Sequence, residues 1–147
     1  KMAWYFQTSA HDTHDWDSAQ TPILIDGTIN GRPRKLVSTA SRNGYFFTVD
    51  RVTGEHIVTS KYGTATNWAK DTRPTGVVEP DLQKSATIPG SLVSPVERGV
   101  TNWAPSAFAS GTTCWVPHWV LHQGSRWCAF SGGRWEHSGT TRTSKRY

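Results

Sequence analysis

The sequence predicts an all-β protein, and three observations support this prediction. The 147 residues include 13 Gly and 8 Pro, so long helices are disfavoured. Short apolar runs alternate with turns that contain Gly, which is typical of antiparallel strands. Only 18% of the residues are charged and eight are Trp, and such chains are rarely disordered because indole rings need packing partners. No apolar run approaches the ~18 residues that a membrane-spanning helix needs.

Four short strands are expected between residues 22 and 60, paired as one antiparallel sheet. The first covers Pro22–Ile25 and is expected to stop at Asp26-Gly27, and the others cover 35–40, 45–49 and 55–60. Turn signals at 30–31, 42–44 and 50–54 separate them, since Asn and Gly accept positive φ. Four strands in about forty residues resemble one propeller blade, although a sandwich has a similar local pattern. One blade cannot close a propeller, so a chain of this length would be a piece of one.

The remaining segments carry weaker strand signals. Residues 63–100 are rich in turns and are expected to hold little regular structure beyond one strand at Ile88–Val93. Residues 109–147 contain four of the eight Trp and few large aliphatic residues, and strand periodicity fades there. We expect a divergent, irregular tail, disordered or translated out of frame. Its two cysteines, Cys114 and Cys128, define no disulfide framework.

The net charge of +5 lies mostly in this tail. Residues 1–100 carry 11 Lys or Arg against 10 Asp or Glu, whereas residues 101–147 carry five against Glu136 alone. A basic tail that contains Trp can grip single-stranded nucleic acid by stacking and phosphate contacts. A solvated end explains the same composition, and we expect no nucleic-acid partner.

The densest polar cluster is the segment 11–17, which reads HDTHDWD. Its three carboxylates would repel one another unless a bound cation or hydrogen bonds to neighbouring groups offset the repulsion. One hypothesis is a metal site, although the histidine spacing is a weak zinc signal. Another is a polar loop whose Asp residues cap turns. A third is a catalytic base, with Asp17 held in place by the packed indole of Trp16. Arg42 would then stabilise negative charge on a substrate or cofactor oxygen, or would simply be a surface turn residue.

Three separated strings bear a family resemblance. They are KMAWYFQTSAHDTHDWDSAQTPILI, then RKLVSTASRNGYFFTVDRVTGE, then GSLVSP followed by GVTNWAPSAF. In this order and spacing they resemble the pyrroloquinoline-quinone (PQQ) dependent alcohol dehydrogenases, the quinoprotein family. The resemblance covers residues 1–108 and implies a fragment, about two blades, of an eight-bladed β-propeller, with residues 109–147 as the divergent tail.

The resemblance also implies roles for three residues. Asp17, the last residue of HDTHDWD, matches the family's general base, which takes the alcohol proton and also contacts the cation. Arg42 in SRNG matches the basic residue that hydrogen-bonds the quinone oxygens, and Asn102 in TNW matches a cofactor-contacting asparagine. Members that use lanthanides carry an aspartate two residues after the base, and this position is Ala19 here, so the resemblance implies Ca²⁺. Trp4 and Trp16 resemble structural indoles.

The function expected from the resemblance is oxidation of a primary alcohol by hydride transfer to PQQ, with a cytochrome c as electron acceptor and a periplasmic location. The family's other cation ligands, its stacking tryptophan and its vicinal cysteine pair match nothing in this segment, so this chain alone is expected to be inactive. The alternative is a non-catalytic, β-rich binding module that has lost the cofactor site. A two-blade piece would also expose sheet edges and apolar faces, which predicts self-association.

Overall fold

The structure, a computed structural model, describes residues 1–63, 65–86 and 89–103 and four later strands. Its described elements are strands and one short 3₁₀ helix, which confirms the all-β prediction. Among these residues no helix has the length and hydropathy to cross a membrane. The elements are β1 (Ile23–Ile29), β2 (Arg32–Ala40), β3 (Tyr45–Asp50), β4 (His56–Lys61), β5 (Ala69–Thr72), β6 (Val78–Pro80), η1 (Leu82–Lys84), β7 (Ser106–Ala109), β8 (Cys114–Pro117), β9 (Arg126–Ala129) and β10 (Trp135–Ser138).

The first sheet has the strand order β1-β2-β3-β4 and is antiparallel throughout, as predicted for residues 22–60. The Asp26-Gly27 stop signal was wrong, because β1 continues to Ile29, which pairs with Arg32. The two-residue loop between them has positive φ at both Asn30 (50°) and Gly31 (76°). This is the turn that matches the twist of a tight hairpin, so it rather than Asp26-Gly27 ends the strand.

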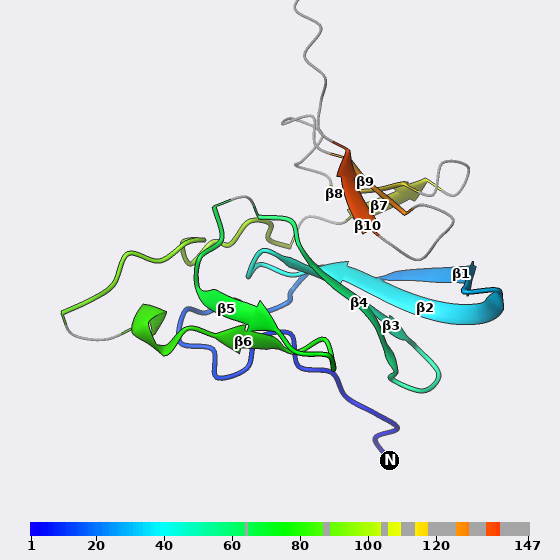
Figure 1. Ribbon diagram of the computed structural model, residues 1–147, viewed down its shortest axis with the longest axis horizontal. Coiled ribbons are helices and arrows are strands. Elements are labelled where there is room, and N and C mark those ends of the chain that lie inside the picture. Colours follow the sequence, from blue (N-terminus) through cyan, green and yellow to red (C-terminus); the bar gives the residue numbers. More distant parts are fainter. Residues whose placement is uncertain are drawn as a thin grey trace, which may run out of the picture.

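A second four-stranded sheet, in the order β10-β9-β8-β7, lies beside the first (Figure 1). Three of its strands fall within residues 109–147, where strand periodicity was expected to fade. The register pairs Trp115 with Trp127 and Cys114 with Cys128. Aromatic and β-branched residues favour strands even where aliphatic alternation is absent, which explains why the pattern missed them. The remainder of the tail lies outside the described residues, and its out-of-frame origin stays a hypothesis.

Residues 63–100 contain a hairpin that the sequence did not predict. Strands β5 and β6 pair across a turn closed by the Gly76 amide, which donates to the Arg73 carbonyl at 2.8 Å. The expected strand at 88–93 was wrong for its described part, 89–93, which is not a strand. Gly90 has φ of 94° and Pro89 lacks an amide hydrogen, so this stretch cannot continue a ladder.

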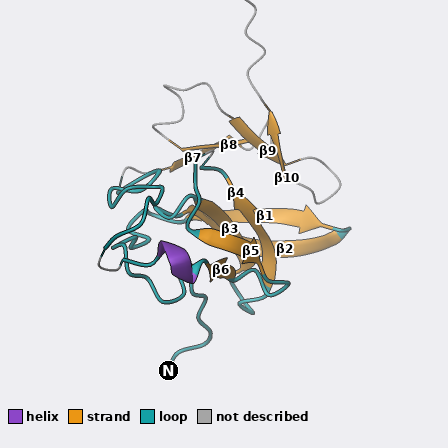
Figure 2. Ribbon diagram, turned by 60° about the vertical axis from the view of Figure 1, so that its left-hand side comes forward, coloured by secondary structure: helices purple, strands orange, loops and turns teal. Residues whose placement is uncertain are grey.

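The first sheet lies between the second sheet and the β5–β6 hairpin (Figure 2), and each of its faces has a buried cluster. The face toward the hairpin joins Trp16, Trp68 and Val78 to the β3 side chains Tyr45 and Phe47. The opposite face joins Ala40, Phe46 and Tyr62, against which Phe108 of β7 packs. The alternation of β3 side chains between the two clusters is the period-2 geometry of a strand buried on both faces.

At the end of the first sheet opposite the 41–44 turn, the Asp50 carboxylate makes hydrogen bonds and an ion pair. Asp50 accepts hydrogen bonds from the amides of Val52 (2.9 Å) and Thr53 (3.2 Å), and Arg34 contacts its other oxygen at 3.2 Å. The hydrogen bond from the Val52 amide is the largest cause that lowers the pKa of the Asp50 carboxyl. The Arg34 guanidinium and the Thr53 amide lower it further. The charged form of Asp50 therefore stabilises the turn that joins β3 to β4.

This arrangement predicts an acid-dependent loss of stability. A carboxyl whose pKa is lower in the folded chain contributes stability that is complete above its unfolded pKa of about 3.9 and is lost as pH falls through the folded value. Asp50→Asn should remove this contribution, so its urea midpoint should fall less steeply than the parent's as pH drops below about 4. An equally steep fall in both proteins would show that Asp50 does not carry the effect.

Candidate functional site

The segments that carry the predicted site residues come together at one end of the first sheet, where β2 passes into β3 through residues 41–44. The blue N-terminal segment and the yellow-green 90–103 segment both reach this end (Figure 1). The Ser18 and Ser41 hydroxyls are 2.8 Å apart, and the Val100 amide donates to the Arg42 carbonyl at 2.9 Å. The segments that carry Asp17, Arg42 and Asn102 are thus tied together, although they lie far apart in sequence.

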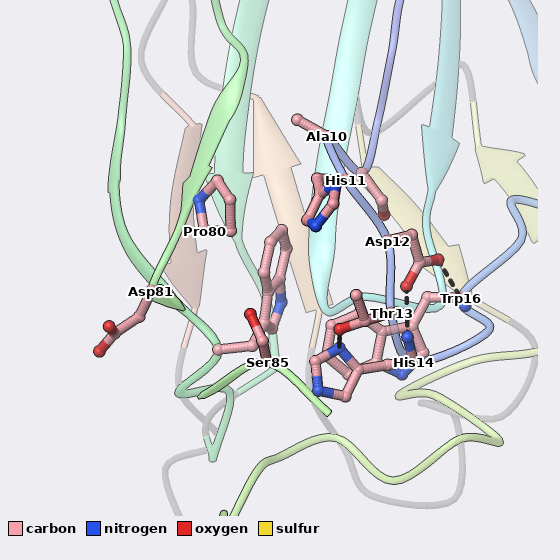
Figure 3. Close-up of a pocket in the computed structure, with 11 residues that line it drawn as sticks. Ala10, His11, Asp12, Thr13, His14, Trp16, Pro80, Asp81 and Ser85 are labelled. Carbon is pink, nitrogen blue, oxygen red and sulfur yellow. Dashed lines mark hydrogen bonds between the residues drawn. The ribbon is translucent and has the colours of Figure 1, made fainter. Parts of the chain in front are cut away.

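The HDTHDWD segment is a capped loop. The Asp12 carboxylate accepts from the His14 amide at 2.8 Å and from the Trp16 amide at 2.7 Å (Figure 3). The His14 ring stacks on Trp16 at a centroid distance of 4.4 Å, and its Nε2 donates to the Lys84 carbonyl at 2.8 Å. These contacts agree with the interpretation of Asp12 as a turn cap.

The zinc hypothesis for this segment receives no support. His14 uses its Nε2 hydrogen on a carbonyl, so that nitrogen is not available to a metal. Across the described ranges, no three His, Cys, Asp or Glu residues are grouped so that they could hold a metal ion. A pocket lies between this loop and residues 80–85, but its cavity volume is only about 10 Å³, the space of about one water molecule (Figure 3). It is far too small for a quinone.

Trp16 anchors the loop in the core, as the sequence predicted. Its side chain is 2% exposed, and its Nε1 donates to the Val96 carbonyl at 3.1 Å. The residues on either side, Asp15 and Asp17, are both exposed. Neither carboxylate has a hydrogen-bond or ion-pair partner among the described residues. Asp15 also has a left-handed backbone with φ of 62°, which is uncommon for residues other than Gly and is often found at functional sites.

Arg42 is half-buried on the turn after β2. Its Nη2 donates to the Glu97 carbonyl, and its Nε is buried without a partner in the described part of the chain. An unsatisfied buried donor is costly, so this nitrogen is suited to an acceptor supplied by a ligand or by water. No ion pair joins Arg42 to Asp17 among the described residues. The guanidinium thus keeps donors for an anionic or carbonyl oxygen.

Asn102 serves its own segment. Its Nδ2 donates to the Arg98 carbonyl at 3.1 Å, and its Oδ1 accepts from the Trp103 amide at 2.9 Å. Each end of the amide keeps one more hydrogen-bonding position, because the group can make four bonds. The predicted contact with a cofactor is therefore chemically open to Asn102, while the observed bonds shape the 98–103 turn.

Sequence reasoning missed the residues that hold this site together. The sequence carries no signal that marks Ser18 or Ser41, and it marks Asn43 only as a turn residue. Asn43 is fully buried and donates to the Thr8 carbonyl at 2.8 Å. Three polar residues followed by Gly in SRNG could have hinted at a buried polar turn, but nothing local marks burial.

The close approach of Gly99 to Arg42 makes a testable prediction. A Cβ at Gly99 would lie 2.6 Å from both the Cβ and the carbonyl oxygen of Arg42, whereas a Cβ at Gly31 meets nothing within 4 Å. Both glycines have nearly the same φ, +75° and +76°. Gly31→Ala should lower the free energy of unfolding by about 1–3 kcal/mol through backbone strain alone. Gly99→Ala should lower the urea-derived stability further, because backbone must move. Equal losses would show that the 99–42 contact is not tight.

Comparison with known families gives one match to a family model. The PQQ family, described as the β-propeller domain of glucose, ethanol and alcohol dehydrogenases, matches residues 1–87. This range includes the HDTHDWD and SRNG segments and the whole first sheet.

Several curated proteins are similar over most of the chain. The quinohemoprotein alcohol dehydrogenase of Comamonas testosteroni is 35% identical over 112 residues, which cover 74% of this chain and 15% of that protein. The 1-butanol dehydrogenase (cytochrome c) of Thauera butanivorans is 32% identical over 114 residues (76% and 16%). A lanthanide-dependent methanol dehydrogenase of Methylorubrum extorquens is 39% identical over 66 residues (45% and 11%). The chain thus spans less than a fifth of the length of each of these relatives.

The fold agrees with these sequences. The crystal structure of the Comamonas testosteroni enzyme matches with a TM-score of 0.68 and 28% identity, over 85% of this chain and 18% of that one. The two four-stranded sheets are therefore a fragment of a larger β-propeller.

Proposed function

Because the chain belongs to the PQQ dehydrogenase β-propeller family, we propose that it forms part of the active site of a PQQ-dependent alcohol dehydrogenase. The observation that supports this most strongly is the convergence of the Asp15–Asp17 loop and Arg42 at one end of the first sheet, through the Ser18–Ser41 hydrogen bond. The substrate is a small primary alcohol, oxidised in the periplasm with a cytochrome c as electron acceptor. The Thauera butanivorans relative is named for 1-butanol and cytochrome c, which supports both choices.

The described residues fit one side of such a site. Arg42 offers a buried Nε that has no partner among the described residues, which suits an acceptor oxygen of an anionic quinone. Two exposed carboxylates, on Asp15 and Asp17, are the hard oxygen donors that Ca²⁺ or a lanthanide prefers. Such a cation takes about six to eight oxygens, so these residues would supply only part of its ligands. PQQ, when bound, supplies the electron acceptor for the alcohol.

The chain's own contribution is to take a proton and to hold the oxygens. An exposed aspartate beside Trp16 accepts the alcohol proton, and the packed indole keeps that carboxylate in place. Asp17 is our first candidate for this base, and Asp15 is the second because of its left-handed backbone. Arg42 donates to the quinone oxygens, and Asn102 adds an amide contact from the neighbouring loop.

The identity of the base and the identity of the cation are linked. In the family, lanthanide-using members carry an aspartate two residues after the base. If the base is Asp17, this position is Ala19 and the cation is Ca²⁺. If the base is Asp15, this position is Asp17 and the cation is a lanthanide, as in the Methylorubrum extorquens relative. We therefore propose Ca²⁺ together with Asp17 as the base, and evidence against Asp17 as the base would also count against Ca²⁺.

Replacing each aspartate in an active enzyme distinguishes the candidates. Residues 1–103 would replace the matching segment of the Comamonas testosteroni enzyme, and alcohol oxidation would be followed with a dye acceptor. Asp17→Asn should lower kcat about 10²–10⁴-fold, since Asn keeps the shape but cannot accept the proton. Asp12→Asn is the matched control and should lower kcat less, because the Asp12 carboxylate is bonded to two backbone amides and is not the group proposed to accept the proton. A fall with Asp15→Asn and parental turnover with Asp17→Asn would transfer the role of base to Asp15.

Binding by the chain itself tests the proposal without turnover. The absorbance spectrum of PQQ should change when the 147-residue chain is added in the presence of Ca²⁺. Asp17→Ala should weaken that change. A response with La³⁺ but not Ca²⁺ would favour Asp15 as the base. No response with either cation would contradict PQQ binding by this chain and favour the alternative, a non-catalytic β-rich binding module.

A further inference from the structure

Three hydroxyl groups form a chain at the candidate site, two from the N-terminal segment and one from the turn after β2. Thr8 Oγ1 lies 2.9 Å from Ser18 Oγ, which lies 2.8 Å from Ser41 Oγ. Ser18 immediately follows Asp17, and Ser41 immediately precedes Arg42. The Ser18–Ser41 bond is therefore a direct side-chain link between the residue after the candidate base and the residue before the candidate quinone ligand.

Ser41 is a rigid anchor for this link. It has no exposed surface, and its carbonyl accepts from the Tyr62 hydroxyl at 2.7 Å and from the Gly44 amide at 3.1 Å. Ser18 is exposed and comes from a loop, so its position depends on what it bonds. A hydroxyl bond between a fixed and a movable partner restricts the movable one, here the backbone that carries Asp17.

We propose that Ser18 and Ser41 are a positioning pair, whose hydroxyl bond sets where Asp17 lies relative to Arg42. The proposal rests on the proposed function, since only there does the spacing of these two side chains matter for catalysis. Neither serine touches the reacting atoms in this scheme. Thr8 supports the pair by offering Ser18 a second hydrogen bond.

The sheet contains a matched control. Ser38 and Thr48 form a similar hydroxyl pair, 2.7 Å apart and buried between β2 and β3. Ser38→Ala removes a hydroxyl bond of the same kind that joins β2 to β3 and does not involve the segment with Asp17. Ser18→Thr keeps the hydroxyl at the exposed position and serves as the conservative rescue.

The first measurement needs no cofactor. In the 147-residue chain, Ser18→Ala should shift the backbone amide resonance of Arg42, and Ser41→Ala should shift that of Asp17. Each reporter lies more than twenty residues from the substitution, so a shift reports the link rather than sequence proximity. Ser18→Thr and Ser38→Ala should leave both reporters near their parental positions. Because Ser18 is exposed, Ser18→Ala keeps the test valid even if Ser41→Ala does not fold. Unmoved reporters would overturn the proposal.

The second measurement separates this proposal from the proposed function. Loss of one hydrogen bond that positions the site should raise the PQQ dissociation constant of Ser18→Ala about 2- to 10-fold, with parental affinity in Ser18→Thr and Ser38→Ala. Parental affinity in Ser18→Ala would refute the pair's effect on the site. If the parent does not bind PQQ while the amide reporters shift, PQQ binding by this chain fails and the link between the two segments stands.

Discussion

The turn at residues 41–44 is buried, and its polar groups must find hydrogen-bond partners away from water. Asn43 meets much of this need. Its side chain donates to the Thr8 carbonyl and to Ser9 Oγ and accepts from the Tyr45 amide, while its carbonyl accepts from Trp68 Nε1 at 2.7 Å. The N-terminal segment and the segment after β4 are thereby fastened to the same turn. An unsatisfied buried group there would cost about 1–3 kcal/mol, which makes these bonds structural requirements.

This constraint also decides how the candidate site is built. Arg42 lies between two fully buried residues, Ser41 and Asn43, so its backbone is fixed while its side chain stays half-buried. The loop with Asp17 is held by a different anchor, the buried indole of Trp16. The Arg42 side chain thus projects from a rigid turn, Asp17 follows a buried indole, and the Ser18–Ser41 bond joins the two segments. Such preorganisation matters most where charge develops during a reaction.

Much of the first sheet follows from the sequence, because hairpins depend on local signals. Alternating bulky residues in 45–49 and the Asn-Gly pairs at 30–31 and 43–44 correctly predicted the strands and two of their turns. The strands with weak local signals were missed. In β5 the sequence AKDT has no apolar alternation, and the hairpin forms because Val78 of β6 is fully buried against the aromatic cluster.

By itself the sequence determined the all-β class, the order of the first four strands and, through three separated motifs, the quinoprotein family. It also indicated the residue types that such chemistry uses, at Asp17, Arg42 and Asn102. Only the tertiary structure decided that the segments carrying these residues are joined, and that Arg42 retains a buried donor without a partner among the described residues. These outcomes depend on hydrogen bonds between residues 23 to 80 positions apart, such as Ser18–Ser41 and Trp16–Val96. Local propensity carries no information about pairings at that separation, because they form only once the sheet brings the segments together.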